Sequence, residues 1–436
     1  ESWRPPLLRP VAPQKKGGKG PAARERALEK LKEKIRETKS WKDQKPQQAA
    51  REEPPARPAA KQGLSSTPEG WPKLNLYQLL PEELEDWLEN DLGQPRSRAT
   101  QLSQLLYRDG IKSFEEMTSL PLELRQELDR VACIGADWEV LAEQVSRDGT
   151  MKRAYGVPGG HAIESVLMPY DDGRQTACIS TQVGCAQGCV FCATGQMGFK
   201  RHLTSAEIFE QAARFAAALR SSGKRLSQVV LLGMGEPLAN FDNTLAAVKR
   251  INKELGIGMR RITISTVGLV PEIRKLAAEQ LQVTLAISLH AASNEERSAL
   301  LPANRRFPLE TVMEAAREYK QVTGRRVSFE WTLIDGKNDD VATARRLGQL
   351  IASSAPGSHV NLIPLNPTGG FQGGPTQRQA TARFVDALRP YGIEATVRVR
   401  RGIDIDAGCG QLAERAAATY EQEAATPAEP AVLLRE

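Results

Sequence analysis

The chain has 436 residues, enough for one large domain and a small one, and 40% of them are hydrophobic. No run of about 18 apolar residues occurs and residues 1–20 lack an apolar core, which excludes a membrane-spanning helix and argues against a secretory signal. Six cysteines are too few for a disulfide scaffold, and the net charge of +6 comes from residues 1–60, with 16 Lys and Arg against 8 Asp and Glu.

Residues 1–72 are interpreted as a disordered basic extension or linker, because Pro, Ala, Gln and Lys dominate them. A phosphate-binding arm and a remnant of organelle targeting are the alternatives. Glu–Lys and Glu–Arg pairs four residues apart predict a short helix within residues 21–41.

Residues 73–150 are predicted to form a small helical domain. Three segments, 76–92, 97–110 and 120–131, have apolar residues at helical spacing and polar residues on the opposite face. The pattern changes after this region, so a domain boundary is expected before residue 160.

Residues 160–415 alternate short β-branched runs with amphipathic helical segments, which predicts an α/β fold with parallel strands. The expected strands are 175–181, 228–233, 261–266, 282–290, 327–334, 360–365 and 394–400. The expected helices between them are 204–222, 243–255, 270–280, 308–324, 339–354 and 377–391. About six βα units indicate an open (β/α)6 barrel with its site at the C-terminal strand ends. Residues 416–436 are interpreted as a disordered tail.

Three cysteines, Cys185, Cys189 and Cys192, follow the first of these strands with the spacing C-x3-C-x2-C. A structural zinc site usually takes four ligands, and only His202 is available as a fourth. Three thiolates instead suit a 4Fe-4S cluster with one iron open to another ligand, which is the favoured interpretation. Thr204 and Glu207 are spaced as a capping box that starts the next helix.

This spacing, with Phe191 before the last cysteine, resembles the radical S-adenosylmethionine (SAM) superfamily. Six strings over residues 75–415 resemble the RlmN/Cfr family of RNA adenine methyltransferases: GCAQGCVFCATGQMGFKRHLT, GMGEPLAN, ITISTVGLVP, ISLHA, NLIPLNP and RGIDIDAGCGQLA. The resemblance implies a radical SAM partial (β/α)6 barrel, one 4Fe-4S cluster held by the three cysteines, and SAM bound at the open iron. It also assigns contacts with SAM to seven residues: Gly235, Glu236, Ser265, Ser288, Leu289, His290 and Asn366.

Two further cysteines receive roles from the resemblance. Cys409, in a Gly-flanked loop, is expected to be accessible as a thiolate nucleophile, and the family match implies that it accepts a methyl group from SAM. Cys178 would then resolve the covalent RNA–protein thioether by forming a disulfide with Cys409. Glu164 matches the general base of the family, and an edge-strand carboxylate facing water is the alternative. Cys133 is expected to be an inert hydrophobic residue.

The implied product is C2-methyladenine in 23S-type large-subunit rRNA and in some tRNAs, 3′ of the anticodon. Methylation at C8, another radical SAM activity such as that of an activase, and a zinc-stabilised RNA-binding module are the rivals. Cations expected to grip RNA phosphates occur at residues 199–202, 260–261, 305–306, 325–326 and 398–402. A monomer in the cytoplasm, supplied with electrons by a flavodoxin or ferredoxin, is expected; an organelle matrix is the alternative.

Overall fold

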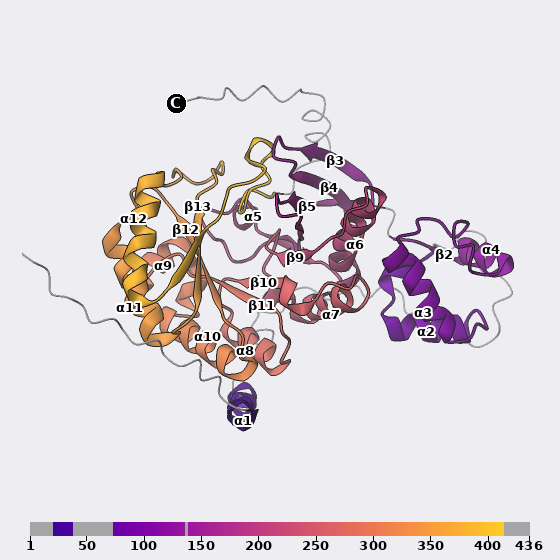
Figure 1. Cartoon of the computed structure of the whole chain (residues 1–436), viewed down its shortest axis with the longest axis horizontal. Coiled ribbons are helices and arrows are strands. Elements are labelled where there is room, and N and C mark those ends of the chain that lie inside the picture. Colours follow the sequence, from indigo (N-terminus) through magenta and orange to yellow (C-terminus); the bar gives the residue numbers. More distant parts are fainter. Residues whose placement is uncertain (1–20, 38–72, 136–137, 414–436) are drawn as a thin grey trace, which may run out of the picture.

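The computed structural model describes residues 21–37, 73–135 and 138–413 (Figure 1). The disorder predicted for residues 1–20, 38–72 and 416–436 lies outside the described residues. Among the residues that are described, no helix is long and apolar enough to cross a membrane.

The centre of the molecule is a ten-stranded sheet in the order β14-β13-β12-β11-β10-β9-β6-β5-β4-β3. Every neighbouring pair from β6 to β14 is parallel, as the alternation of strands and helices predicted. These seven strands are β6 (Gln175–Cys178), β9 (Gln228–Leu231), β10 (Ile262–Thr266), β11 (Thr284–Ser288), β12 (Ser328–Leu333), β13 (His359–Pro364) and β14 (Glu394–Val397). They confirm the seven predicted strands and the partial barrel.

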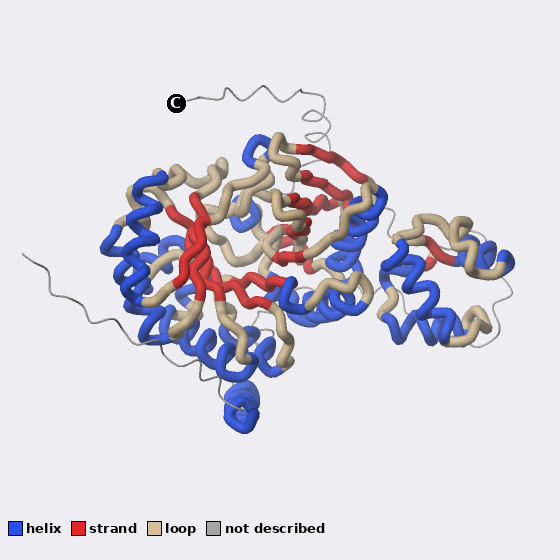
Figure 2. Tube along the Cα trace, viewed as in Figure 1, coloured by secondary structure: helices blue, strands red, loops and turns tan. Residues whose placement is uncertain are grey.

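Helices cover the outside of this curved sheet, and the strands form its inner wall (Figure 2). The six crossover helices are α6 (Ser205–Ser221), α7 (Phe241–Lys253), α8 (Val270–Ala278), α10 (Leu309–Thr323), α11 (Val341–Ser354) and α12 (Arg378–Leu388). Shorter elements in the loops are α5 (Ala193–Gln196), η4 (Pro237–Asn240), η5 (Met259–Arg261), α9 (Asn294–Leu300), η6 (Pro302–Arg305), η7 (Arg389–Tyr391) and η8 (Ile403–Ile405). The predicted capping box starts α6, since the side chain of Thr204 accepts a hydrogen bond from the N–H of Glu207.

Three antiparallel strands extend the sheet beyond β6: β5 (His161–Pro169), β4 (Met151–Val157) and β3 (Val140–Val145). β3 falls within the range predicted for the helical domain, yet it pairs with β4 in the main sheet. β5 lies between two neighbours, so the alternative that Glu164 faces water from an edge strand is wrong; this residue is 1% exposed.

The small N-terminal domain lies beside α6 and α7 (Figure 1). It contains β1 (Leu74–Asn75), η2 (Leu76–Gln78), α2 (Pro81–Asn90), α3 (Ser97–Ser103), the π-helical turn η3 (Gln104–Asp109), α4 (Leu122–Val131) and β2 (Ala132–Cys133). The rings of Tyr77 and Tyr107 both pack edge-on against Phe209 of α6. The predicted helical domain therefore shares a core with the barrel.

One helix of the N-terminal extension also belongs to the folded part. α1 (Pro21–Glu37) lies within residues 21–41, where the Glu–Lys and Glu–Arg pairs predicted a helix, and it packs against α8 and α10. Leu31 is 2% exposed, and Lys34 lies 2.9 Å from Glu314 and 2.5 Å from Glu318. The interpretation of residues 1–72 as disordered therefore fails for this segment.

Candidate active site

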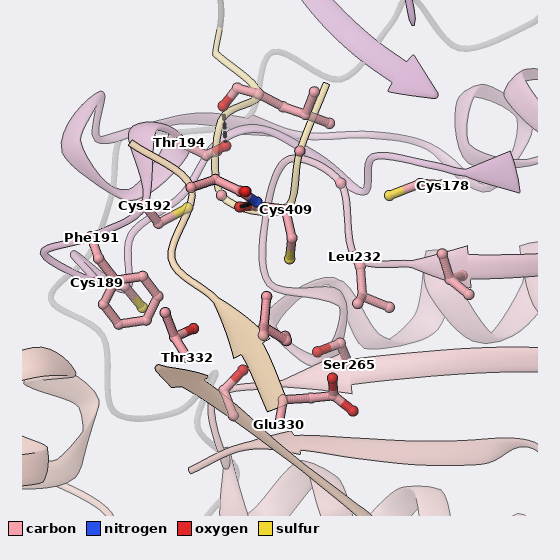
Figure 3. Close-up of a pocket in the computed structure, with 18 of the residues that line it drawn as sticks. Cys178, Cys189, Phe191, Cys192, Thr194, Leu232, Ser265, Glu330, Thr332 and Cys409 are labelled. Carbon is pink, nitrogen blue, oxygen red and sulfur yellow. Dashed lines mark hydrogen bonds between the residues drawn. The ribbon is translucent and has the colours of Figure 1, made fainter. Parts of the chain in front are cut away.

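A cavity of about 180 Å³ opens at the C-terminal ends of the parallel strands, the end of the barrel at which the site was predicted. Five of the six cysteines line it: Cys178, Cys185, Cys189, Cys192 and Cys409. Figure 3 shows Cys189 and Cys192 on the cysteine loop, Cys178 on β6 and Cys409 on the C-terminal loop, all bordering the cavity. Residues spaced over more than two hundred positions thus share one chamber.

The loop with the three clustered cysteines is closed at its base by a small antiparallel pair, β7 (Gln182–Gly184) and β8 (Phe199–His202). The N–H of Cys185 donates to the carbonyl of Gly198 at 2.9 Å. Gly184 has φ of +70°, and a Cβ there would lie 1.9 Å from that same carbonyl oxygen. Only glycine fits this approach, so the closed loop is specified by sequence.

The three clustered thiols suit a multi-iron cluster better than a single ion. Burial raises the pKa of Cys185 to about 12 and raises those of Cys189 and Cys192 as well, so metal ligation has to displace their protons. No three His, Cys, Asp or Glu side chains within the described ranges lie close enough to bind one metal ion. In a cube each thiolate binds its own iron, so wider spacing fits a 4Fe-4S cluster and does not favour zinc.

His290 closes the cavity beside the cysteine loop. Its ring lies 4.9 Å from that of Phe191, edge to face, and its Nδ1 accepts a hydrogen bond from the N–H of Thr332 at 2.8 Å. Burial, and then the charge of Arg297, lower its pKa to about 3. His290 is therefore a neutral wall of the cavity rather than a proton donor at neutral pH.

Glu236 presents a buried carboxylate at the end of β9. Its two oxygens accept hydrogen bonds from the N–H groups of Leu238 at 3.0 Å and Val267 at 2.8 Å. Burial raises its pKa to about 7 despite these bonds. The preceding Gly235 has φ of +103°, and a Cβ there would lie 2.6 Å from the Cβ of Gln182, so glycine is required.

The remaining residues expected at SAM divide into two groups. Ser265, Ser288 and Asn366 line the cavity, and the side-chain oxygen of Asn366 is buried without a hydrogen-bond partner in the described part of the chain. An unpartnered acceptor of this kind suits a polar ligand such as SAM. Leu289 does not line the cavity, since its side chain is fully buried in the core, and its contact with SAM stays a prediction.

Cys409 and Cys178 enter the same cavity from opposite elements. Cys409 is solvent-accessible, since the cavity is open, but its protein surroundings raise its pKa to about 11. Burial raises the pKa of Cys178 to about 12, and Arg398 opposes both shifts. Both are free thiols, and at neutral pH both are protonated, contrary to the expectation of a ready thiolate at Cys409.

Glu164 does not line the cavity. One carboxylate oxygen lies 3.2 Å from the Nζ of Lys152, and the other accepts a hydrogen bond from the N–H of Ala413 at 3.0 Å. The adjacent Leu412 does line the cavity, so the carboxylate is one residue removed from it. Cys133 lies in the small domain, half-buried, and its thiol donates to the carbonyl of Gly135.

The predicted cations lie at both ends of the barrel. Arg398 lines the cavity, and Arg401 stacks on Tyr170 with 4.4 Å between the guanidinium and the ring centroid. The pairs at 260–261 and 325–326 directly precede β10 and β12, so they lie at the opposite, N-terminal end. These two pairs are wrongly predicted as contacts near the site.

One charged residue of the cavity, Glu330, was missed. Glu330 of β12 is 2% exposed, and its Oε2 has no hydrogen-bond partner within the described residues, although Arg398 lies 3.6 Å away. A charged residue inside the apolar string VSFEWTLI was the available signal. Glu330 and Arg398 form a charged pair in the cavity wall.

Comparison with known protein families divides the chain as the fold does. Residues 179–347 match the radical SAM superfamily, and residues 74–134 match the ribosomal RNA large subunit methyltransferase N-terminal domain. The second match covers the small helical domain from β1 to β2.

Relatives align over most of the chain. A probable dual-specificity RNA methyltransferase RlmN 2 of Opitutus terrae is 45% identical over 78% of this chain and 86% of its own length. A dual-specificity RNA methyltransferase RlmN 1 of Myxococcus xanthus is 48% identical over 78% of this chain and 94% of its own. The crystal structure of a radical SAM methyltransferase from Sphaerobacter thermophilus is 45% identical, with a TM-score of 0.73, over 78% of this chain and 99% of that one.

Proposed function

Because this chain belongs to the RlmN family of radical SAM RNA methyltransferases, we propose that it methylates C2 of an adenine in RNA. The substrates are large-subunit rRNA and tRNAs with an adenine 3′ of the anticodon, in keeping with the dual specificity named for its relatives. The observation that carries the proposal is the convergence of five thiols on one cavity. A one-electron donor such as a flavodoxin or ferredoxin completes the requirement.

Cys185, Cys189 and Cys192 would hold a 4Fe-4S cluster, which with bound SAM supplies the radical that activates an S-methyl group. Glu236, in contact with Gly235, is suited to meet the SAM ammonium, since its carboxylate is half ionised near pH 7. Ser265, Ser288, His290 and Asn366 surround the same space and would orient the rest of SAM.

Cys409 is the acceptor of a methyl group from one SAM, with loss of its thiol proton. A hydrogen atom then leaves that S-methyl group, and the resulting carbon radical adds to C2 of adenine. One electron would pass from the adduct back to the one-electron donor system, which balances the electron used to form the radical, and Glu164 receives the C2 proton in the proposal. Because its carboxylate lies behind Leu412, it would act through a shift of the 412–413 segment or through water.

Cys178 resolves the covalent adduct. Its thiolate attacks the sulfur of Cys409 and the carbon–sulfur bond breaks with its electron pair on the carbon. That carbon takes up a proton from solvent to become the methyl group of the product, and a disulfide between the two cysteines remains. Arg398 would assist, because its positive charge opposes the high pKa of both thiols. Both thiols line the same cavity, which is the requirement for this exchange.

The test is a trap. Cys178→Ala, expressed in cells, is expected to accumulate RNA linked to Cys409 through a methylene bridge, because the resolving thiol is missing. Nuclease digestion and mass spectrometry of the Cys409 peptide would detect an adenosine adduct. Cys133→Ala, which removes a cysteine away from the cavity, is the matched control and is expected to carry none.

Three outcomes would contradict parts of the proposal. A Cys178→Ala protein that loads iron but carries no RNA argues against the methyl-cysteine route and returns attention to the activase reading. An adduct on a cysteine other than Cys409 reassigns the acceptor. Chromatography of the methylated nucleoside from wild-type enzyme against C2 and C8 standards decides the carbon.

A further inference from the structure

Arg297, on α9, is a cation in the interior without an anionic partner. It is fully buried, and among the described residues no carboxylate lies within ion-pair distance of its guanidinium. A buried charge without a partner costs several kcal/mol in most proteins. Such a residue requires either a strong polar cage or a nearby anion.

A polar cage is present, and it joins two of the strands that border the cavity. The guanidinium donates to the carbonyls of Val267 at 2.5 Å, beyond the end of β10, and of Ser288 at 3.1 Å, at the end of β11. It also donates to the carbonyl of Leu289 at 3.3 Å and to Asn304 Oδ1 at 2.9 Å. The cage supplies dipoles but no negative charge.

The same segment touches the cysteine loop. The carbonyl of Leu300, the last residue of α9, accepts a hydrogen bond from the N–H of Val190, between two of the clustered cysteines. Val267 and Ser288, whose carbonyls bind the guanidinium, line the same cavity as Cys189. The guanidinium is therefore held directly behind the wall of the cavity that contains the thiols assigned to the cluster by the proposed function.

The missing anion follows from the charge of the cluster itself. Three thiolates around an oxidised 4Fe-4S cube leave about one net negative charge, and reduction by one electron adds a second. Since Arg297 is held in a low-dielectric interior, its attraction for this charge is stronger than it would be at the surface. The reduced cluster, which carries the larger negative charge, is therefore stabilised more than the oxidised cluster.

We propose that Arg297 is the counter-charge of the iron–sulfur cluster and makes its reduction potential less negative. This inference rests on the proposed function. The hydrogen bonds of Arg297 also hold the backbone at the ends of β10 and β11, which border the proposed SAM site, so Arg297 is a positioning residue as well. A merely structural residue would leave the potential unchanged, and this difference is what the test measures.

The experiment uses the full chain reconstituted anaerobically with iron and sulfide. Arg297→Gln removes the charge, Arg297→Lys keeps it, and Arg305→Gln removes an exposed arginine from the following segment as the matched control. Each is titrated with dithionite and followed by electron paramagnetic resonance. The midpoint potential is expected to become more negative in Arg297→Gln, to remain closer to wild type in Arg297→Lys, and to be unchanged in Arg305→Gln.

Iron content of each variant makes the remaining outcomes decisive. A fully loaded Arg297→Gln protein with the wild-type potential overturns the inference. If Arg297→Gln fails to load, full loading of Arg297→Lys supports the requirement for charge, whereas failure of both supports a purely structural cage and refutes it. A wild-type chain that takes no cluster contradicts the proposed function itself, which separates the two failures.

Discussion

The side chains of Cys178 and Cys409 show how strongly the cavity raises the pKa of the thiols that line it. The surroundings raise the pKa of the first to about 12 and of the second to about 11, so neither thiol is a nucleophile until a proton is removed. The pKa of His290, lowered to about 3, makes its imidazole too weak a base for that task. Under the proposed function, each thiol therefore has to lose its proton to another base before it reacts.

Glu236 leads to a prediction about pH. Because its pKa is raised to about 7, its carboxylate is mostly protonated at pH 6 and mostly ionised at pH 8. If only the ionised form of Glu236 binds the SAM ammonium, the affinity for SAM should be about tenfold weaker at pH 6 than at pH 8. The reason is that the ionised fraction of Glu236 falls about tenfold over this range. Equilibrium dialysis with labelled SAM on the reconstituted protein measures this dependence.

Glu236→Gln is the control for that measurement. It keeps a hydrogen-bonding side chain but has no proton to lose over this range, so its SAM affinity should be weak and nearly independent of pH. A wild-type affinity that does not change between pH 6 and pH 8 would remove Glu236 from the proposed contact.

The β7–β8 pair is the element on which the cysteine loop depends. Its two glycines, Gly184 and Gly198, both have positive φ, at +70° and +76°. They differ in surroundings, since a Cβ at Gly184 would strike a backbone carbonyl and a Cβ at Gly198 would meet nothing within 4 Å. Alanine substitutions at these two glycines can therefore be compared directly, because only the one at Gly184 introduces a steric clash.

Gly184→Ala is expected to open the base of the loop, because the clash involves backbone that cannot turn aside. The reconstituted variant should lose most of its iron and its brown colour. Gly198→Ala bears only the strain of positive φ, roughly 1 kcal/mol or somewhat more, and should retain most of both. Iron analysis and visible absorbance test the pair, and equal iron in the two variants would refute the role of the clash.

In the whole molecule, the small domain is joined to the barrel by a buried arginine, Arg250. Arg250 of α7 forms an ion pair with Glu254 at 2.8 Å and donates to the hydroxyl of Tyr107 at 3.1 Å and to the carbonyl of Tyr77. Its guanidinium also lies 4.1 Å from the ring centroid of Phe209. One side chain thus connects two domains that family comparison recognises separately.

Arg250→Met should lower the free energy of unfolding by about 3–5 kcal/mol, because it leaves Glu254 buried without its partner. Arg250→Met combined with Glu254→Gln removes the unpaired charge and should be less destabilised than the single variant. Denaturant unfolding followed by circular dichroism measures both. If the single variant is as stable as wild type, the Arg250–Glu254 ion pair does not stabilise the contact between the small domain and the barrel.

The sequence predicted the fold wherever a local pattern was sufficient. Strand–helix alternation indicated the seven parallel strands, and the capping residues at 204 and 207 indicated the start of α6. The C-x3-C-x2-C spacing was also legible, because it depends on residues only a few positions apart. Gly235 came from the family resemblance, since its close approach to Gln182 joins distant parts of the chain. β3 was missed, since its exposed, mixed-polarity residues have no periodicity that distinguishes a sheet edge.

The sequence by itself thus determined the cysteine motif, the order of strands and helices, and the family. The tertiary structure decided which residues share the cavity: it brought Cys178 and Cys409 together, added Glu330 and Arg398, and removed Leu289 and Glu164 from its lining. The physical reason is that burial and electrostatic partners come from strands far apart in the chain. Arg297 is the clearest case, because nothing in its local sequence shows that a charged residue there would be fully buried.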